Sequence, residues 1–345
     1  MVTRRDPVED LKRIAFLLEA ASEPTYRVRA FRRAAQAIAE LPGEELMDRV
    51  QRGTLPDLPG IGEVMERTVA ESLRGEEPVY LRRLEATGGR PVAEGAATLL
   101  ASLRGDCHVH SDWSDGGSPI REMAETARGL GHEWMVLTDH SPRLTVANGL
   151  SPDRLRQQLT EVDALNVQLA PFRILTGIEV DILSDGSLDQ QDELLARLDL
   201  VVASVHSELR MESRLMTRRL VAALANPHLD VLGHMTGRMT TGKRRRPPSE
   251  FDPEIVFAAA KRFDKAVEVN SRPERLDPPK RLLRLAVEAE CRVAIDSDAH
   301  APGQLAWLPN GCERAFLCGV EPTSVINAQG ADDLLRWTRS HDEAT

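Results

Sequence analysis

Residues 106–110 read Asp-Cys-His-Val-His and form the end of an apolar, strand-like run. In an extended strand, side chains at positions i and i+2 point to the same face, so His108 and His110 can bind one ion together. The same spacing recurs in Asp-Ala-His at residues 298–300, which follow another apolar run. Residues 108–110 and residues 298–300 therefore each carry a pair of metal-ligand residues on a predicted strand.

Further side chains of the metal-ligand type lie between these two stretches, mostly where an apolar run ends. The full set has nine members and includes six of the nine histidines in the chain: His108, His110, Asp115, His140, Glu179, His206, His234, Asp298 and His300. A single histidine is more often structural than a ligand, but six at the ends of predicted strands indicate a shared metal site. His132, His228 and His341 fall outside this pattern, and we interpret them as structural or solvated.

From residue 105 onward, strand-like and helix-like segments alternate. The predicted strands span residues 106–109, 134–138, 173–179, 199–205, 230–233, 266–269 and 292–296. Helical spacing of apolar residues between them occurs at residues 119–129, 152–169, 188–197, 212–225, 253–262 and 279–290. Seven such repeats predict an α/β fold with a closed parallel barrel. Active sites of such barrels lie at the carboxyl ends of the strands, where the nine side chains are expected.

The composition of this set indicates which ions it suits. Imidazoles mixed with carboxylates favour zinc, manganese or iron over calcium or magnesium. Nine ligands are too many for one ion and suit two or three divalent ions, with Glu179 as a bridge. Two neighbouring ions can deprotonate a shared water and neutralise charge on a phosphate ester, so phosphoester hydrolysis is the leading prediction, with Glu179, His206 and Asp298 as catalytic residues. Spacing alone leaves deamination and amide hydrolysis open.

Bulk composition restricts the remaining possibilities. The 345 residues carry a net charge of −10, which argues against a protein that coats nucleic acid through overall basicity. Four cysteines without a CxxC pair indicate no zinc ribbon or disulfide framework. The chain has no apolar leader and no run of about 18 apolar residues, so we expect a cytoplasmic protein without membrane contact. The oligomeric state is left open.

The first 85 residues have a different pattern, with two helices expected between residues 8 and 41 and another from about residue 63 to 73. Between them, Leu-Pro-Gly-Ile-Gly at residues 58–62 has the form of a helical hairpin turn. Gly60 and Gly62 allow the backbone close to a phosphate, and the following helix terminus supplies N–H donors. Three arginines assigned to one helix face are predicted to add phosphate contacts: Arg29, Arg32 and Arg33.

Other features of this segment keep DNA binding open. Glu63 directly follows the turn, and residues 1–100 contain 15 basic and 17 acidic residues. The alternative is a domain retained for packing or protein contact. Outside this segment, Lys243 and Arg244 belong to a basic run, and Arg272 follows the sixth predicted strand; these three are predicted to bind substrate phosphate or DNA.

These motifs resemble the PHP (polymerase and histidinol phosphatase) family, particularly the PHP domain at the carboxyl end of bacterial family X DNA polymerases. All of that family's ligand motifs occur in order between about residues 105 and 339. The resemblance implies a distorted (β/α)7 barrel with a trinuclear site holding zinc, manganese or iron, in a phosphoesterase of nucleic-acid ends or small phosphate esters.

The beginning of the chain also resembles the first domain of those polymerases, through Pro-Thr-Tyr-Arg at residues 24–27 and the hairpin turn. Only about twenty residues separate this domain from Asp106, which leaves no room for a palm and fingers, so no nucleotide transfer is expected. We therefore predict the following organisation: a helix-hairpin-helix domain at 1–85, a linker at 86–104, a PHP barrel at 105–339 and a tail at 340–345.

Three functions are compatible with these observations. The first is a phosphoesterase acting on DNA at 3′ ends or abasic sites in repair. The second is a small-molecule phosphomonoesterase of the histidinol-phosphatase type. The third is a non-catalytic DNA-end binding or scaffold protein, for which the complete ligand set would have no purpose.

Overall fold

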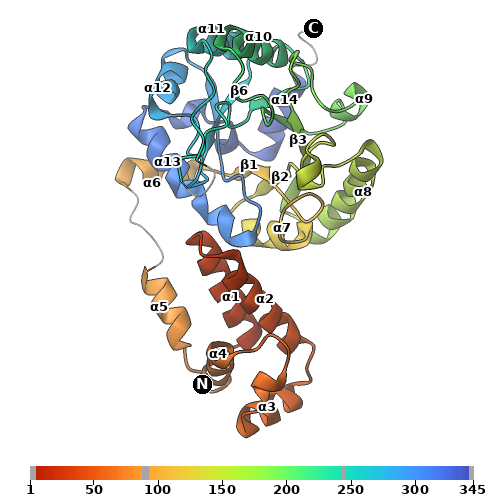
Figure 1. Ribbon diagram of the computed structural model, residues 1–345, viewed down its shortest axis with the longest axis vertical. Helices are drawn as coiled ribbons and strands as arrows, with labels where there is room; N and C mark the ends of the chain where they lie inside the picture. Colours follow the sequence, from red (N-terminus) through yellow and green to blue (C-terminus); the bar gives the residue numbers. More distant parts are fainter. Residues whose placement is uncertain (1–4, 88–92, 242–244, 342–345) are drawn as a thin grey trace. The chain divides into compact units, whose positions relative to one another are not determined.

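The computed structural model describes residues 5–87, 93–241 and 245–341. The chain divides into two compact units, residues 1–91 and residues 92–345 (Figure 1). In the described residues, no helix combines the length and the apolar character needed to cross a membrane.

The first unit consists of short helices around one apolar core (Figure 1). Its elements are α1 (Pro7–Ala20), α2 (Thr25–Ala39), α3 (Gly43–Arg52), a 3-10 turn (Leu55–Asp57), α4 (Glu63–Leu73) and α5 (Val79–Thr87). Leu11, Ile14 and Leu18 repeat at helical spacing on α1 and are fully buried, as the apolar pattern predicts. The prediction missed α3, because Leu46 is the only buried residue of that helix and one residue gives no period.

The hairpin turn between the 3-10 turn and α4 requires glycine at one of its positions. Gly60 has a φ of +86°, a conformation that favours glycine, and Gly62 is extended and directly precedes α4. The N–H of Ile61 donates to the carbonyl of Leu58 and closes the turn. Backbone conformation therefore explains the glycine at position 60.

The second unit contains a single sheet of seven parallel strands in sequential order. The strands are β1 (Gly105–Val109), β2 (Trp134–Leu137), β3 (Arg173–Asp181), β4 (Leu200–Ser204), β5 (Val231–Leu232), β6 (Ala266–Asn270) and β7 (Arg292–Asp296). A parallel bridge from Val109 to Ala299 joins the first strand to the segment after the last, so the sheet closes on itself. The predicted seven-stranded barrel is confirmed.

Helices cover the outside of the barrel. They are α6 (Glu94–Ser102), α7 (Ile120–Gly129), α8 (Pro152–Leu169), α9 (Asp192–Leu195), α10 (Ser213–Leu224), α11 (Pro253–Arg262), α12 (Lys280–Glu288), α13 (Leu308–Leu317) and α14 (Ala331–Arg339). The helix predicted over residues 188–197 is reduced to α9, because Leu188 forms an antiparallel bridge with Ile182 instead.

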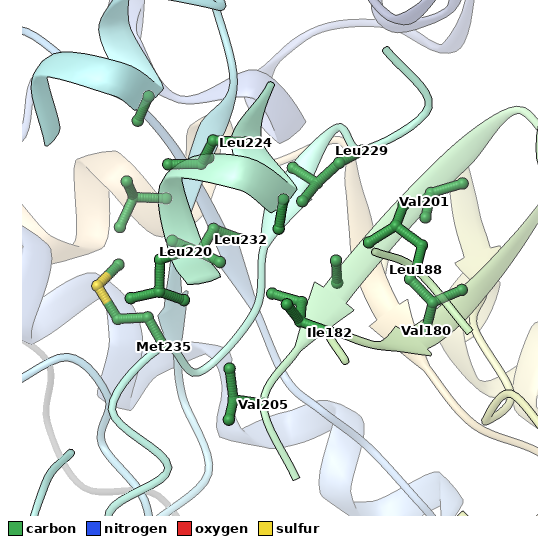
Figure 2. Close-up of a cluster of buried hydrophobic side chains, with 14 of the residues drawn as sticks. Val180, Ile182, Leu188, Val201, Val205, Leu220, Leu224, Leu229, Leu232 and Met235 are labelled. Carbon is green, nitrogen blue, oxygen red and sulfur yellow. The ribbon is translucent and has the colours of Figure 1, made fainter. Parts of the chain in front are cut away.

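A large apolar cluster lies between α10 and the strands β3 to β5. Figure 2 shows Leu220 and Leu224 of α10 close to Leu232 of β5. Val180 and Val201 extend the same cluster into β3 and β4. These strands read as continuous apolar runs because parallel strands in a covered barrel are buried on both faces. This packing holds the strand ends, and hence the side chains that follow them, in place.

Candidate metal centre

The carboxyl ends of six strands bring the predicted ligand set together. His108 lies in β1, His110 directly follows it, and Glu179 lies in β3. His140, His206 and His234 come after β2, β4 and β5, and Asp298 and His300 come after β7. Asp115 comes from the loop between β1 and α7. All except Asp115 and the partly exposed His206 and His300 are buried. All nine lie in one connected cluster.

Glu179 lies at the centre of this cluster. Its Oε2 atom is 2.9 Å from His140 Nδ1 and 3.3 Å from His108 Nε2. Its Oε1 atom is 2.8 Å from His234 Nε2 and 3.4 Å from His206 Nε2. Imidazoles therefore surround both oxygens, which is the arrangement expected of a carboxylate that bridges two cations.

The ligand atoms form overlapping groups, in which the atoms lie within 4.8 Å of one another. The outer group, at the mouth of the barrel, consists of His110, Asp115, His140 and His300. Asp115 Oδ1 lies 3.3 Å from His300 Nε2 and 3.5 Å from His140 Nε2. Two deeper groups share members with it: His108, His110 and Asp298 in one, and His140, Glu179 and His206 in the other. Overlap of this kind suits neighbouring ions with shared ligands.

Hydrogen bonding within the cluster is incomplete. Among the described residues, the buried Nε2 atoms of His108, His110 and His206 and both Glu179 oxygens have no hydrogen bond of acceptable geometry. Buried polar atoms are nearly always paired, and each unpaired one costs on the order of 1–3 kcal/mol. Imidazole nitrogens and carboxylate oxygens left unpaired in one place fit divalent ions of the zinc, manganese or iron type.

The charges of the cluster depend on one another. Burial alone would raise the pKa of the Glu179 carboxyl, but the facing imidazoles, His140 and His108 first, hold that pKa well below its ordinary value. Burial likewise disfavours a charged His206, yet the carboxylates of Glu179 and Asp181 raise its pKa to about 9. Glu179 thus remains a carboxylate, the form that binds a cation.

Two acidic side chains outside the predicted set orient the histidines. His206 Nδ1 donates to Asp181 Oδ1 at 2.5 Å, and His108 Nδ1 donates to Glu268 Oε1 at 2.6 Å. Each bond leaves Nε2 of the ring facing Glu179. Such carboxylate–histidine pairs commonly fix the tautomer of a metal-binding imidazole. Sequence reasoning missed both acids, although an acidic residue inside an apolar strand run was the available signal.

Two arginines from the loop after β6 border the cluster. Arg272 Nη1 lies 3.2 Å from His300 Nδ1 and 3.8 Å from Asp298 Oδ1. Arg275, which the sequence did not single out, places Nε 3.1 Å from Asp298 Oδ2. Its buried Nε and Nη1 atoms have no hydrogen bond of acceptable geometry in the described part of the chain. This loop therefore places positive charge beside the ligand set.

Two other aspartates near the ligands, Asp139 and Asp106, have structural partners. Asp139 accepts hydrogen bonds from Ser111, Ser114 and Gln158, so it anchors the loop after β1. Asp106 accepts from Ser297 Oγ at 2.5 Å and from the N–H of His108, which ties β1 to the residue after β7. Asp139 is thus an acceptor at a strand end.

The residues predicted to bind phosphate or DNA in the first unit have different environments. Arg32 pairs with Glu19 at 3.0 Å and is half-buried, whereas Arg29 and Arg33 are exposed. Arg33 lies beside the hairpin turn, since a Cβ built on Gly60 would meet the Arg33 side chain at 4.0 Å. Of the predicted basic residues in the second unit, Lys243 and Arg244 lie outside the described residues.

Comparisons with known proteins agree with this geometry. The family model of the PHP domain matches residues 106–272, and that of the helix-hairpin-helix domain matches residues 3–77. The chain is 40% identical over 243 residues to the DNA polymerase/3′-5′ exonuclease PolX of Bacillus subtilis, a match that covers 70% of this chain and 42% of that protein. The chain thus spans less than half the length of that relative.

A second relative is covered over most of its length. The chain is 30% identical over 205 residues to a probable phosphatase of Acetivibrio thermocellus, covering 56% of this chain and 78% of that protein. Among solved structures, the histidinol phosphate phosphatase of Lactococcus lactis, complexed with zinc, L-histidinol and phosphate, aligns with a TM-score of 0.43 at 17% identity, over 70% of this chain and 93% of that one. With its barrel, its ligand set and a helix-hairpin-helix domain ahead of them, the chain belongs to the PHP family.

Proposed function

We propose that this protein is a metal-dependent phosphoesterase that hydrolyses phosphate esters of DNA, at 3′ ends or abasic sites, in repair. The observation that carries the proposal is the buried set of imidazoles around Glu179, in which several ring nitrogens have no well-aligned hydrogen bond within the described residues. The nine residues of the set would hold two or three divalent ions. Bound ions of this kind supply Lewis acidity to a phosphoryl group and lower the pKa of water.

Side chains of the protein then orient the substrate. Arg272 and Arg275 would bind phosphoryl oxygens, because a guanidinium can donate two parallel hydrogen bonds to a phosphate. Arg275 is suited to this role by its buried nitrogens beside Asp298, which have no well-aligned acceptor within the described residues. The catalytic roles proposed for Glu179, His206 and Asp298 are to hold the ions in a fixed position relative to that phosphate.

The first unit supports DNA as the substrate. The backbone at Gly60 and Gly62 leads directly into the N-terminus of α4, and Arg33 lies beside it. A turn that exposes N–H groups at a helix N-terminus, next to a cation, suits a DNA phosphate. Nucleotide transfer is not part of the proposal, because only residues 88–104 lie between α5 and β1.

The test uses the full chain loaded in turn with zinc, manganese and iron. Each preparation is given DNA with a 3′-phosphate, DNA with an abasic site, single-stranded DNA and small phosphate esters. Under this proposal, at least one DNA substrate is turned over, and this turnover is lost when a chelator removes the metal. Cleavage of small phosphomonoesters with no turnover of any DNA would contradict it.

A second candidate is a small-molecule phosphomonoesterase of the histidinol-phosphatase type. The observation in its favour is the similarity to a probable phosphatase that this chain covers over 78% of its length. It predicts that substitution of Arg33 by Glu leaves every activity unchanged. Under the DNA proposal, the same variant binds DNA more weakly and its affinity depends less steeply on salt.

A further inference from the structure

Strand β6 differs from the other six strands of the barrel, because it contributes no residue of the predicted ligand set. It nevertheless places two polar side chains, Glu268 and Asn270, at positions i and i+2, which point to the same face of a strand. Both are fully buried, at 1% and 0% exposure. A buried acid and a buried amide inside an apolar strand are costly unless they are satisfied.

Glu268 is satisfied by two ligand-bearing segments. Its Oε1 atom accepts from His108 Nδ1 at 2.6 Å, and its Oε2 atom accepts from the backbone N–H of His234. One carboxylate therefore holds the ring of a residue from β1 and the backbone of a residue that follows β5. It sets both the tautomer and the direction of His108.

Asn270 extends this contact to a third segment. Its Nδ2 atom donates to Asp298 Oδ2 at 3.1 Å and lies 3.3 Å from Glu268 Oε2. Its Oδ1 atom accepts from the N–H of Arg272 at 3.0 Å. The amide thus fixes one oxygen of Asp298 and the start of the arginine loop, while the other oxygen of Asp298 lies 3.6 Å from His110 Nε2.

We propose that Glu268 and Asn270 are positioning residues, which hold His108 and Asp298 in the orientation that binds the deeper ion. This inference rests on the metal-dependent function proposed above. It is specific for one part of the centre, because among the described residues neither side chain has a hydrogen bond or ion pair with a side chain of the outer group. Loss of either residue should therefore weaken the binding of the deeper ion and leave the outer ion in place.

The experiment compares four variants of the full chain with the wild type: Glu268→Gln, Asn270→Ala, Asp115→Asn and the double variant Asp115→Asn/Glu268→Gln. Metal bound per chain is measured by mass spectrometry after equilibrium dialysis against buffered free manganese or zinc. Thermal unfolding of the metal-free proteins shows whether each variant folds. Asp199→Asn is the matched control, because Asp199 is another barrel carboxylate, directly before β4 at the amino-terminal end of the strands, and accepts hydrogen bonds from the N–H and hydroxyl of Thr176 rather than from a ligand.

Glu268→Gln is expected to lower the affinity for one ion about 10- to 100-fold, the usual effect of losing the partner of a metal-binding histidine. Asn270→Ala should weaken the same ion by a smaller factor. Asp115→Asn should lower the affinity for a different ion, so the double variant should bind two ions more weakly than the wild type does. Asp199→Asn should bind metal as the wild type does.

Wild-type metal affinity in a folded Glu268→Gln variant would overturn the inference, as would a double variant that loses no more than Asp115→Asn does. If Glu268→Gln does not fold, Asn270→Ala decides: a selective loss of one ion supports the inference, and unchanged affinity contradicts it. A wild-type chain that binds no metal would instead contradict the proposed function itself, so the two failures are distinguishable.

Discussion

Buried histidines lie near carboxylates at both ends of the barrel, but their hydrogen bonding differs. At the amino-terminal ends of the strands, His341 places Nδ1 2.8 Å from Asp230 Oδ1 and Nε2 3.1 Å from the carbonyl of Asp264. At the carboxyl ends, His110 is fully buried and neither ring nitrogen has a hydrogen-bond partner within the described residues. Residue type and burial are alike, so the unpaired nitrogens distinguish a metal-binding centre from a structural pair.

The largest expected effect comes from Glu179→Gln, which tests the carboxyl end directly. A neutral amide cannot attract cations as the carboxylate does, and its NH₂ group would face imidazole nitrogens. Loss of several kcal/mol of stabilisation corresponds to a fall in phosphoesterase activity of roughly 1000-fold or more. Steady-state rates and metal content of the folded variant check this. Full activity with full metal content would refute the assignment of Glu179.

The ligand set could be predicted from the sequence because its members follow apolar strand runs, and parallel strands bring such positions to one edge. The residues behind the ligands were missed, because an acidic residue inside an apolar strand run does not by itself show what it contacts. Asp181 and Glu268 belong to no spacing motif, and their role depends on which ring nitrogen they contact across the barrel. Arg275 is one of several arginines in the chain until the loop after β6 places it beside Asp298.

The fold could likewise be predicted where the signal is local in the sequence, but not where it depends on contacts between distant residues. Strands such as β7 were predicted with the observed bounds, because their apolar runs are continuous and end in polar residues. His341 was assigned to a charged tail, but it is 5% exposed and packs against Asp230. A contact between residues 111 positions apart leaves no trace in local periodicity.

The second prediction concerns the amino-terminal end of the barrel. His341→Ala removes one partner of a buried pair and leaves Asp230 with the bond from the N–H of Val201 and the charge of Lys265. Breaking such a pair should lower the free energy of unfolding by about 2–4 kcal/mol. Urea unfolding measures this, and metal content and activity should stay at wild-type levels. A loss of metal from this variant would show that the two ends are not independent.

Removal of metal should have an effect of similar or slightly smaller size. A ligand at about 100 times its Kd stabilises the folded state by about 2.7 kcal/mol, so dialysis against a chelator should lower the free energy of unfolding by about that amount. The shift should be the same in His341→Ala, because distant sites contribute additively. Calorimetry with and without chelator checks both statements, and a shift that is absent in the wild type would contradict the metal centre.

The smallest effect concerns His132, in the turn between α7 and β2 at the amino-terminal end of the barrel. Burial lowers the pKa of this imidazole to about 4, below an unfolded value of about 6.5. A histidine with a lowered pKa binds its proton more readily in the unfolded chain, so stability is lost as the pH falls from about 6.5 towards 4.

Urea unfolding at pH 7 and pH 5 compares the wild type with His132→Gln, which has no proton to gain in this range. The wild type should lose about 1–2 kcal/mol more than the variant between these two values. An equal loss in both proteins would mean that His132 titrates alike in the folded and unfolded chain. The expected difference would extend the comparison, because Nδ1 of His132 also has no hydrogen-bond partner within the described residues, but no carboxylate contributes to its pKa shift. An unpaired nitrogen without facing carboxylates then produces acid sensitivity, whereas unpaired nitrogens around Glu179 produce a site for cations.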